Sequence, residues 1–245
     1  MKLITLGTSA GDPTFDRFNS GNLVLERGSA YLLDAGGPVT ALMIRKNIDL
    51  NSIRAVFITH MHEDHFGGLS GLLKNRMRDL PEGRFMEVWL PQDDAARAFR
   101  TLMDVQFHGD QQNRIVYKLI TSGTFYDNGE IKITAIPTLH CRWHGRHMPC
   151  FAFALETGAR KFVYTGDLLY DCSDFPTAAA ADADLCLSEI THFPAEKALP
   201  YLQSIHPGRM VFTHIQRDIS DKLNFLRPRL PYPCIEAHDG DEFYI

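Results

Sequence analysis

The sequence predicts an α+β fold in which two mixed β-sheets pack face to face and helices cover their outer faces. Apolar, strand-like runs occur in both halves of the chain, and in each half they alternate with amphipathic helical patterns. The chain contains no internal repeat and no linker rich in Pro, Gly or Ser, so we expect residues 1–245 to form one domain. The pattern alone leaves a single doubly wound sheet as the alternative.

Strands begin the first half of the chain, and helices then alternate with strands. Gly7, Gly11 and Gly28 separate three β-rich runs, which predicts an antiparallel meander. These runs are residues 2–6, 22–26 and 30–34. Apolar residues at helical spacing predict three helices, at residues 39–46, 68–78 and 93–107. Buried strands are expected between them, at residues 55–59 and 86–90.

In the second half, short apolar runs again predict strands that alternate with helices. The expected strands are residues 131–136, 151–156, 161–165, 184–187, 210–213 and 242–245. The expected helices are residues 195–205 and 219–226.

Composition indicates a globular protein, and the net charge favours a small anionic substrate held by a few local groups. The chain has 245 residues, 44% of them apolar and 22% charged, which excludes a collagen, a disordered tail and a disulfide-rich miniprotein. The net charge of -5 argues against a long non-specific contact with nucleic acid. Five widely spaced cysteines predict neither a disulfide framework nor a thiolate zinc knuckle. Without an apolar run of membrane-spanning length or a signal-peptide pattern, we expect a cytoplasmic protein with no membrane partner.

The most informative segment is His60–His65, with the sequence HMHEDH, which follows an expected strand. Residues two apart on an extended segment project to the same side, so His60 and His62 can bind one cation. Asp64 and His65 can reach a second point nearby. A solvated polar turn would have to place three histidines and two acids at a strand end by chance. We expect the following glycines, Gly67 and Gly68, to provide the backbone freedom for the turn into a helix.

Three later residues of ligand type also follow apolar strands. His140, Asp167 and His214 each stand where a sheet delivers side chains to a common edge. Each alone would more often be a hydrogen-bonded structural residue. Together they provide the two histidines and one carboxylate that a site for two metal ions sharing one aspartate would still need. Imidazole and carboxylate donors suit Zn²⁺, Mn²⁺, Fe²⁺ or Ni²⁺.

The chain therefore resembles the metallo-β-lactamase superfamily, whose H-x-H-x-D-H signature it matches at every fixed position. Further similar segments are LDAG at 33–36, YTGD at 164–167 and AHDG at 237–240. The resemblance implies an αββα sandwich with a site for two divalent ions, of which Zn²⁺ is the first expectation. It implies that His60, His62 and His140 hold one ion, that Asp64, His65 and His214 hold the other, and that Asp167 bridges both.

Within the superfamily, the chain most resembles the ribonuclease Z-like and related phosphodiesterase branch. The opening LGTSAGDP at 6–13 is similar to that group's glycine turn, and SEIT at 188–191 stands where such enzymes carry H-E-A-T. Ser188 thus replaces a histidine, and the 26 residues between His140 and Asp167 leave no room for an arm that grips tRNA. We therefore expect a small anionic substrate, a nucleotide or a short RNA rather than tRNA.

The expected chemistry is hydrolysis by a hydroxide that bridges the two ions, so that no protein nucleophile is needed. Asp64 would orient this hydroxide, and His192 is the first candidate for the proton donor. A surface or capping histidine is the alternative for His192. Asp34 and Glu189 are expected to hold ligand loops by hydrogen bonds from behind the ligands.

A basic segment follows His140 and is the candidate substrate-binding loop. Its residues Arg142, Trp143, His144, Arg146 and His147 could clamp an anion and stack on a ring, with a solvated basic loop as the alternative. The favoured function is thus a metal-dependent phosphodiesterase. An acyl hydrolase for a lactone or thioester and a non-catalytic metal-binding or sensing module are the alternatives. A homodimer stays open.

Overall fold

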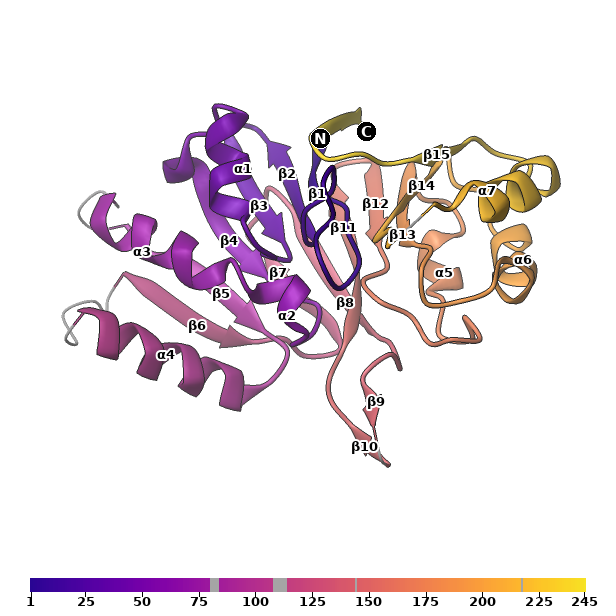
Figure 1. Ribbon diagram of the computed structural model, residues 1–245. Helices are drawn as coiled ribbons and strands as arrows, with labels where there is room; N and C mark the ends of the chain where they lie inside the picture. Colours follow the sequence, from indigo (N-terminus) through magenta and orange to yellow (C-terminus); the bar gives the residue numbers. More distant parts are fainter. Residues whose placement is uncertain (80–83, 108–113, 144, 217) are drawn as a thin grey trace.

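The computed structural model describes residues 1–79, 84–107, 114–143, 145–216 and 218–245. Within these residues, two seven-stranded sheets pack face to face with helices on their outer faces, as Figure 1 shows. The predicted fold class is therefore confirmed, and the alternative of one doubly wound sheet is wrong. No helix among the described residues is long and apolar enough to cross a membrane.

The first sheet has the strand order β16-β1-β2-β3-β4-β5-β6. Its members are β1 (Lys2–Gly7), β2 (Gly21–Glu26), β3 (Ser29–Leu33), β4 (Ile53–Phe57), β5 (Met86–Leu90), β6 (Ile115–Leu119) and β16 (Asp241–Tyr244). Strands β1 to β3 form the expected antiparallel meander, whereas β3 to β6 run parallel. The carboxyl ends of these parallel strands therefore lie at one edge of the sheet.

The second sheet has the order β15-β14-β13-β12-β11-β8-β7. Its members are β7 (Gly123–Asp127), β8 (Lys132–Pro137), β11 (Phe151–Thr157), β12 (Arg160–Tyr164), β13 (Leu185–Glu189), β14 (Met210–Thr213) and β15 (Cys234–Glu236). Strands β12 to β15 are parallel, and β11 is antiparallel to both β8 and β12. Consequently β8, β12, β13 and β14 all end at the same edge.

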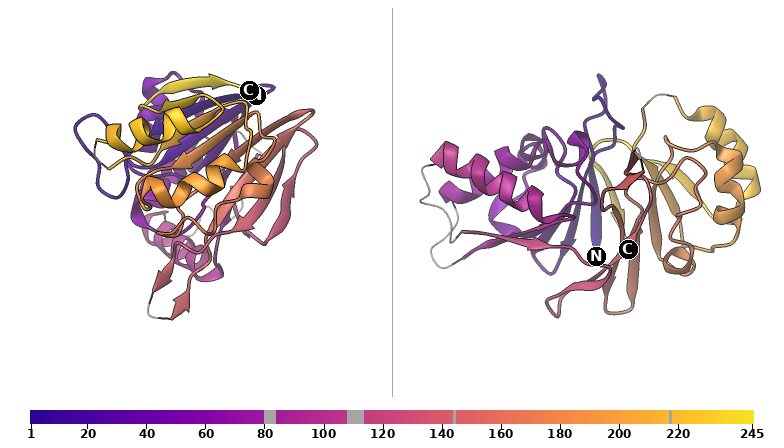
Figure 2. Two further views of the ribbon diagram at one scale, coloured as in Figure 1. Left: turned by 90° about the vertical axis from the view of Figure 1, so that its right-hand side faces the viewer. Right: turned by 90° about the horizontal axis from the view of Figure 1, so that it is seen from below.

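Three apolar layers hold the molecule together. The middle layer packs the inner faces of the two sheets against each other, for example Phe57 of β4 against Phe153 of β11. The outer layer of the first sheet packs against α1 (Val39–Arg45), α3 (Leu69–Asp79) and α4 (Asp93–Phe107). The outer layer of the second packs against α5 (Thr177–Ala180), α6 (Ala195–Gln203) and α7 (Ser220–Leu226). Figure 2 shows the helices on opposite outer sides.

Several short elements escape the sequence pattern for physical reasons. Strand β7 lies at a sheet edge and buries only Tyr126, so it lacks the apolar run of a central strand. The single-turn helices α2 (Glu63–Phe66) and α5 are too short to show helical periodicity. Strands β9 (Arg142–Trp143) and β10 (Arg146–His147) form an exposed hairpin that projects from the sheets (Figure 1).

Candidate metal centre

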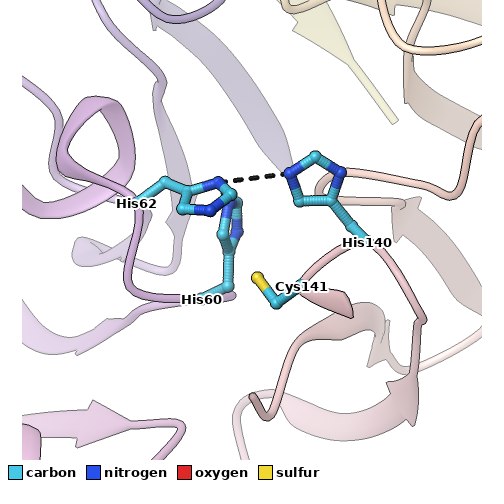
Figure 3. Close-up of side chains that lie close together, drawn as sticks. All are labelled: His60, His62, His140 and Cys141. Atoms are coloured by element: carbon cyan, nitrogen blue, oxygen red, sulfur yellow. Dashed lines mark hydrogen bonds between the residues drawn. The ribbon is translucent and has the colours of Figure 1, made fainter. Parts of the chain in front are cut away.

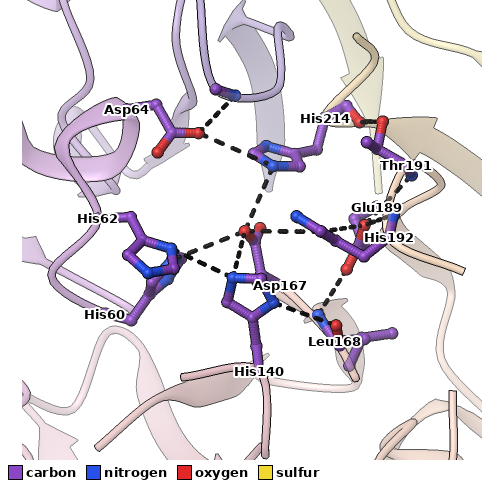
Figure 4. Close-up of polar contacts among 12 residues, drawn as sticks. His60, His62, Asp64, His140, Asp167, Leu168, Glu189, Thr191, His192 and His214 are labelled. Atoms are coloured by element: carbon purple, nitrogen blue, oxygen red, sulfur yellow. Dashed lines mark hydrogen bonds and ion pairs between the residues drawn. The ribbon is translucent and has the colours of Figure 1, made fainter. Parts of the chain in front are cut away.

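The predicted ligand residues converge where strands of both sheets end. His60 lies three residues after β4, His140 three after β8, Asp167 three after β12, and His214 directly after β14. Because these strands all end at this side of the molecule, residues far apart in the sequence reach one cluster (Figure 4). The convergence expected from the sequence is thus observed.

The first group of donors consists of His60, His62 and His140. The Nε2 atom of His60 lies 3.0 Å from Nδ1 of His62, and Nε2 of His140 lies 3.1 Å from the same Nδ1 atom. His60 is fully buried, His140 is partly buried and His62 is exposed. Burial lowers the pKa of all three rings, which keeps the rings neutral, the form that binds a cation.

The second group consists of Asp64, His65 and His214, which are all buried. Their donor atoms lie within 4.8 Å of one another, with Oδ2 of Asp64 3.5 Å from Nε2 of His65 and 3.8 Å from Nε2 of His214. Asp64 also accepts a 2.8 Å hydrogen bond from the backbone N–H of Gly11, which fixes its orientation.

Asp167 lies between the two groups. Its Oδ2 is 3.6 Å from Nε2 of His60 and 3.3 Å from Nε2 of His214, and its Oδ1 is 3.3 Å from Nε2 of His65. Burial by itself raises the pKa of this carboxyl, but His214, His65 and His60 hold the pKa well below its ordinary value. A buried carboxylate surrounded by imidazoles is suited to bridge two cations.

Two buried atoms in the cluster show that the donors fit a cation. Neither Nε2 of His65 nor Oδ1 of Asp167 makes a hydrogen bond of good geometry. A buried polar atom without a partner costs about 1–3 kcal/mol. Both atoms are ligand types for divalent transition metals, so an ion between them would satisfy both.

Four of the five candidate ligand histidines make a hydrogen bond through Nδ1, the ring nitrogen on the side away from the cluster. Nδ1 of His65 is 2.7 Å from Oδ2 of Asp34, and Nδ1 of His214 is 2.9 Å from Oγ of Ser20. On the other side, Nδ1 of His60 is 3.0 Å from Oγ1 of Thr59 and Nδ1 of His140 is 3.3 Å from the Leu168 carbonyl. With Nδ1 engaged, each ring presents Nε2 to the cluster.

Asp34 is the most connected of these supports. Besides His65, its carboxylate accepts 2.8 Å and 2.7 Å hydrogen bonds from the backbone N–H of Thr59 and the hydroxyl of Tyr164. It is fully buried and has a left-handed φ of 58°. A non-glycine residue keeps such a backbone only where its surroundings stabilise it. Asp34 thus contacts His65 from behind, as expected, and its role as a support of a metal ligand stays a prediction.

The glycines of the ligand loop act by allowing close approach rather than by backbone freedom. Gly67 has an ordinary helical backbone, so the expectation that this glycine supplies freedom for the turn is wrong. A Cβ on Gly68 would lie 2.6 Å from the carbonyl oxygen of Gly36, and a Cβ on Gly36 would lie 2.1 Å from that of Asp64. The loop at 34–36 therefore packs directly against the ligand segment.

His192 lies beside the cluster and is held by Glu189. The buried Glu189 carboxylate accepts 2.9 Å and 2.8 Å hydrogen bonds from the backbone N–H and Nδ1 of His192, and a 2.5 Å bond from the Leu168 N–H. Nδ1 of His192 is also 3.8 Å from Oδ2 of Asp167. Burial lowers the pKa of His192, but the hydrogen bond to Glu189 and the negative charges of Glu189 and Asp167 together outweigh burial and raise the pKa to about 9.

The structure places four of the predicted substrate-binding residues, Arg142, Trp143, Arg146 and His147, on strands β9 and β10. Arg142, Arg146 and His147 are exposed, and Nε of Arg142 donates a 2.8 Å hydrogen bond to His147. Among the described residues no hydrogen bond or ion pair joins these side chains to the ligand cluster. Only the backbone of Trp143 is described, and His144 lies outside the described residues.

Sequence reasoning missed several supporting groups. Ser20 lies at a strand border and no local signal marks it, whereas Tyr164 begins the YTGD segment, whose similarity pointed to Asp167 and not to the tyrosine. Gly11 belongs to the glycine turn at 6–13 that the family resemblance singled out, and this turn was the only signal pointing to it. Cys141 also lies close to the first group, and its position directly after His140 was its only mark.

The fold and the cluster define a protein of the metallo-β-lactamase fold with an imidazole and carboxylate site for divalent metal. The metallo-β-lactamase fold protein YhfI from Bacillus subtilis superposes with a TM-score of 0.82 at 19% identity, covering 99% of this chain and 98% of that one. The short form of human tRNase Z superposes with a TM-score of 0.76 at 20% identity, covering 100% and 99%. The chain belongs to the family described as Anti-Pycsar protein Apyc1, whose family model matches residues 1–198.

Curated relatives confirm the resemblance to the ribonuclease Z-like branch. Ribonuclease Z from Brevibacillus brevis is 32% identical over 161 residues, which cover 63% of this chain and 48% of that protein. Ribonuclease BN from Cronobacter sakazakii is 32% identical over 160 residues, covering 64% and 49%. This chain thus spans about half the length of the curated relatives that it matches.

Proposed function

We propose that this protein is a metal-dependent phosphodiesterase that acts on a small anionic or nucleotide-like substrate. The observation that carries the proposal is the position of Asp167 between two donor groups, with His192 beside them. Phosphodiester hydrolysis needs positive charge near the phosphoryl oxygens and a proton for the leaving oxygen, and this arrangement can supply both. The similarity to ribonuclease Z supports the same class of reaction.

Seven side chains would hold two divalent ions. They are His60, His62 and His140 for the first ion, Asp64, His65 and His214 for the second, and Asp167 for both. When bound, such ions lower the pKa of water and neutralise charge on phosphoryl oxygens. We propose Zn²⁺, because nitrogen donors outnumber carboxylates in the cluster, with Mn²⁺, Fe²⁺ and Ni²⁺ as alternatives of the same donor chemistry.

Asp64 is the residue that we propose to orient the attacking water. The hydrogen bond from the Gly11 N–H holds Oδ2 in place, and the carboxylate faces the side of the cluster that His65 and His214 line. A carboxylate held in this way can accept a hydrogen bond from a water molecule and direct its lone pair at phosphorus.

His192 is the proposed proton donor. Glu189 occupies Nδ1 of the ring and stabilises the protonated form, so Nε2–H is left to serve the leaving oxygen. The residue at the histidine position of H-E-A-T does not compete for this role, because Ser188 is fully buried and its hydroxyl donates to the Glu189 carbonyl at 2.9 Å.

The hairpin β9–β10 is the proposed contact for the anionic part of the substrate. It follows His140 directly and carries exposed cationic side chains, so a substrate at the cluster could reach it. We retain Arg142, Trp143, His144, Arg146 and His147 as the substrate-binding candidates. A small nucleotide or short RNA suits a hairpin of this size better than folded tRNA does.

A substrate panel tests the reaction class. Purified, metal-loaded protein is assayed with a chromogenic phosphodiester, a phosphomonoester, a short RNA, a lactone and a thioester. We expect the phosphodiester and the RNA to be turned over at least about a hundredfold faster than the others, because the proposed site combines cations for the phosphoryl oxygens with a proton donor for the leaving oxygen. Preferential turnover of the lactone or thioester would overturn the proposal, as would protein without stoichiometric metal in elemental analysis.

The variant His192→Gln tests the proton donor. With a poor leaving group such as a nucleoside hydroxyl, kcat is expected to fall about 10²–10³-fold, within the range of general acid catalysis. With a p-nitrophenolate leaving group, which needs no proton, kcat should change less than about fivefold. Ser188→Ala, a change in a neighbouring buried side chain outside the cluster, is the control. An equal loss on both leaving groups would contradict the assignment.

A further inference from the structure

Cys141 is the one cysteine whose sulfur the structure brings to the ligand cluster within the described part of the chain. Its Sγ and the donor nitrogens of His60, His62 and His140 all lie within 4.8 Å of one another. Figure 3 shows the sulfur directed toward the three rings, from the backbone position next to His140. The side chain is buried, with 9% of the residue exposed.

We propose that the Cys141 thiolate is a further protein ligand of the ion held by His60, His62 and His140, in addition to the shared Asp167. The inference rests on the proposed metal centre and adds a donor that makes the two ions chemically different. Besides the shared Asp167, the first ion would then have three nitrogens and one sulfur, whereas the second has nitrogen and carboxylate oxygen from Asp64, His65 and His214.

The spacing of the donors suits a single ion. Around a zinc ion, neighbouring imidazole and thiolate donors are separated by about 3–3.5 Å, because the metal bonds are about 2.0–2.3 Å long. The histidine nitrogens already lie 3.0 and 3.1 Å apart, so they need little movement. The sulfur, within 4.8 Å of each, needs a shift of about an ångström, which a rotation of a cysteine side chain provides.

The charge of a bound divalent ion would favour a thiolate at this position. The donors of the first group are neutral rings, and Asp167 is the carboxylate that lies near them, 3.6 Å from His60 and 3.5 Å from His140. Asp167 is also shared with the second group through its contacts with His65 and His214. A second anionic donor would offset the charge of a divalent ion where one shared carboxylate does not.

Cys150 holds Cys141 in place from behind. The backbone N–H of Cys141 donates to Sγ of Cys150 at 3.5 Å, and the Cys150 thiol donates to the carbonyl of Thr138 at 3.0 Å. These bonds tie the base of the hairpin together next to His140. Cys150 is the matched control for Cys141, because it is buried and adjacent in space, and its sulfur contacts Cys141 and the Thr138 carbonyl rather than the histidine rings.

A thiolate changes which metal the first group selects. Sulfur ligands favour Zn²⁺, Cd²⁺ and Co²⁺ over Mn²⁺ and Mg²⁺, whereas carboxylates accept the harder ions. The first group would therefore keep a thiophilic ion in a mixture with Mn²⁺, whereas the second group, which has no sulfur donor, would accept Mn²⁺.

The test is the absorption spectrum of the full-length protein loaded with Co²⁺. A thiolate ligand gives a charge-transfer band in the near ultraviolet that nitrogen and oxygen ligands do not give. We expect this band in the wild type and in Cys150→Ser and Cys234→Ser, and we expect its loss in Cys141→Ser. Circular dichroism establishes that each variant is folded, and elemental analysis gives the Co²⁺ bound per chain. Cys141→Ala repeats the test if the serine variant does not fold.

The outcomes separate this inference from the proposed function. Protein that binds no Co²⁺ would overturn both. Protein that binds two Co²⁺ ions per chain without the band, or that keeps the band in Cys141→Ser, would overturn the thiolate ligand alone. As a second readout, Cys141→Ser should bind Cd²⁺ at least about tenfold more weakly at one site while Mn²⁺ binding stays unchanged. Equal weakening for both ions would contradict a sulfur ligand.

Discussion

The two donor groups of the metal centre differ in how they are built. In the second group, Asp64, His65 and His214 are all buried, and each makes a short hydrogen bond with Gly11, Asp34 or Ser20, respectively. In the first group, His62 is exposed and its Nδ1 faces the other two histidines rather than a support. The second group is thus preorganised, whereas the first has one ligand free to adjust.

This difference teaches how one cluster can combine affinity with access. A donor set that is fixed before binding loses little conformational entropy when an ion enters, so it binds more tightly. An exposed donor beside the hairpin instead leaves a path to the cluster for ions and substrate. Asp167 couples the two groups, because one carboxylate contacts His60 and His140 on one side and His65 and His214 on the other.

The largest expected effect is that of Asp167→Asn, which breaks the coupling between the groups. An amide keeps the size of the side chain but loses the negative charge that a bridging ligand needs. We expect activity on a phosphodiester to fall at least about 10³-fold, equivalent to about 4 kcal/mol of transition-state stabilisation. The protein should stay folded by circular dichroism, with metal content measured in parallel. Activity within tenfold of the wild type would show that the two groups work independently of Asp167.

The next largest effect is expected for Asp34→Asn, which should affect the ion of the preorganised second group and leave the first ion bound. Asparagine tolerates the left-handed backbone at this position but offers one acceptor fewer to His65, Thr59 and Tyr164. We expect the ion of the second group to bind about 10–100-fold more weakly, as for other lost supports of metal-binding histidines. After dialysis against a weak chelator, this variant should retain one ion per chain and the wild type two.

The control for Asp34→Asn is Tyr164→Phe. It removes a single hydrogen bond to the same carboxylate and leaves the contact of Asp34 with His65 in place. Its loss of metal should be smaller than that of Asp34→Asn. Retention of both ions by Asp34→Asn, or loss of both together, would contradict the view that Asp34 supports the second group.

The convergence of the proposed ligands could be predicted from the sequence because their signals are local. Four donors lie within the six residues His60–His65, and His140, Asp167 and His214 each follow an apolar strand that the pattern identifies. The direction of parallel strands then brings their ends to one edge without further information. For the same reason most strands and helices were predicted within a few residues of their observed bounds.

The supports could not be predicted because their partners come from distant strands. Tyr164 looks like any buried aromatic residue of a strand, and only the packing of the two sheets brings its hydroxyl to Asp34. Ser20 meets His214 across 194 residues of sequence. The position of a hydroxyl relative to a ring on another element depends on tertiary packing, which periodicity does not encode.

The smallest expected effect, that of Ser20→Ala, sharpens the comparison. Ser20 is buried and its hydroxyl is the contact of Nδ1 of His214, so its removal frees one ligand of the preorganised group to rotate. Losing one such hydrogen bond, about 1 kcal/mol, should weaken the ion of the second group about fivefold. Competition with a fluorescent chelator measures this change, with Ser188→Ala as the buried control outside the ligand set. If Ser20→Ala instead weakened binding of the ion in the first group, the orientation of His214 would affect both ions. Asp167, which contacts both groups, would then couple their geometry as well as their charge.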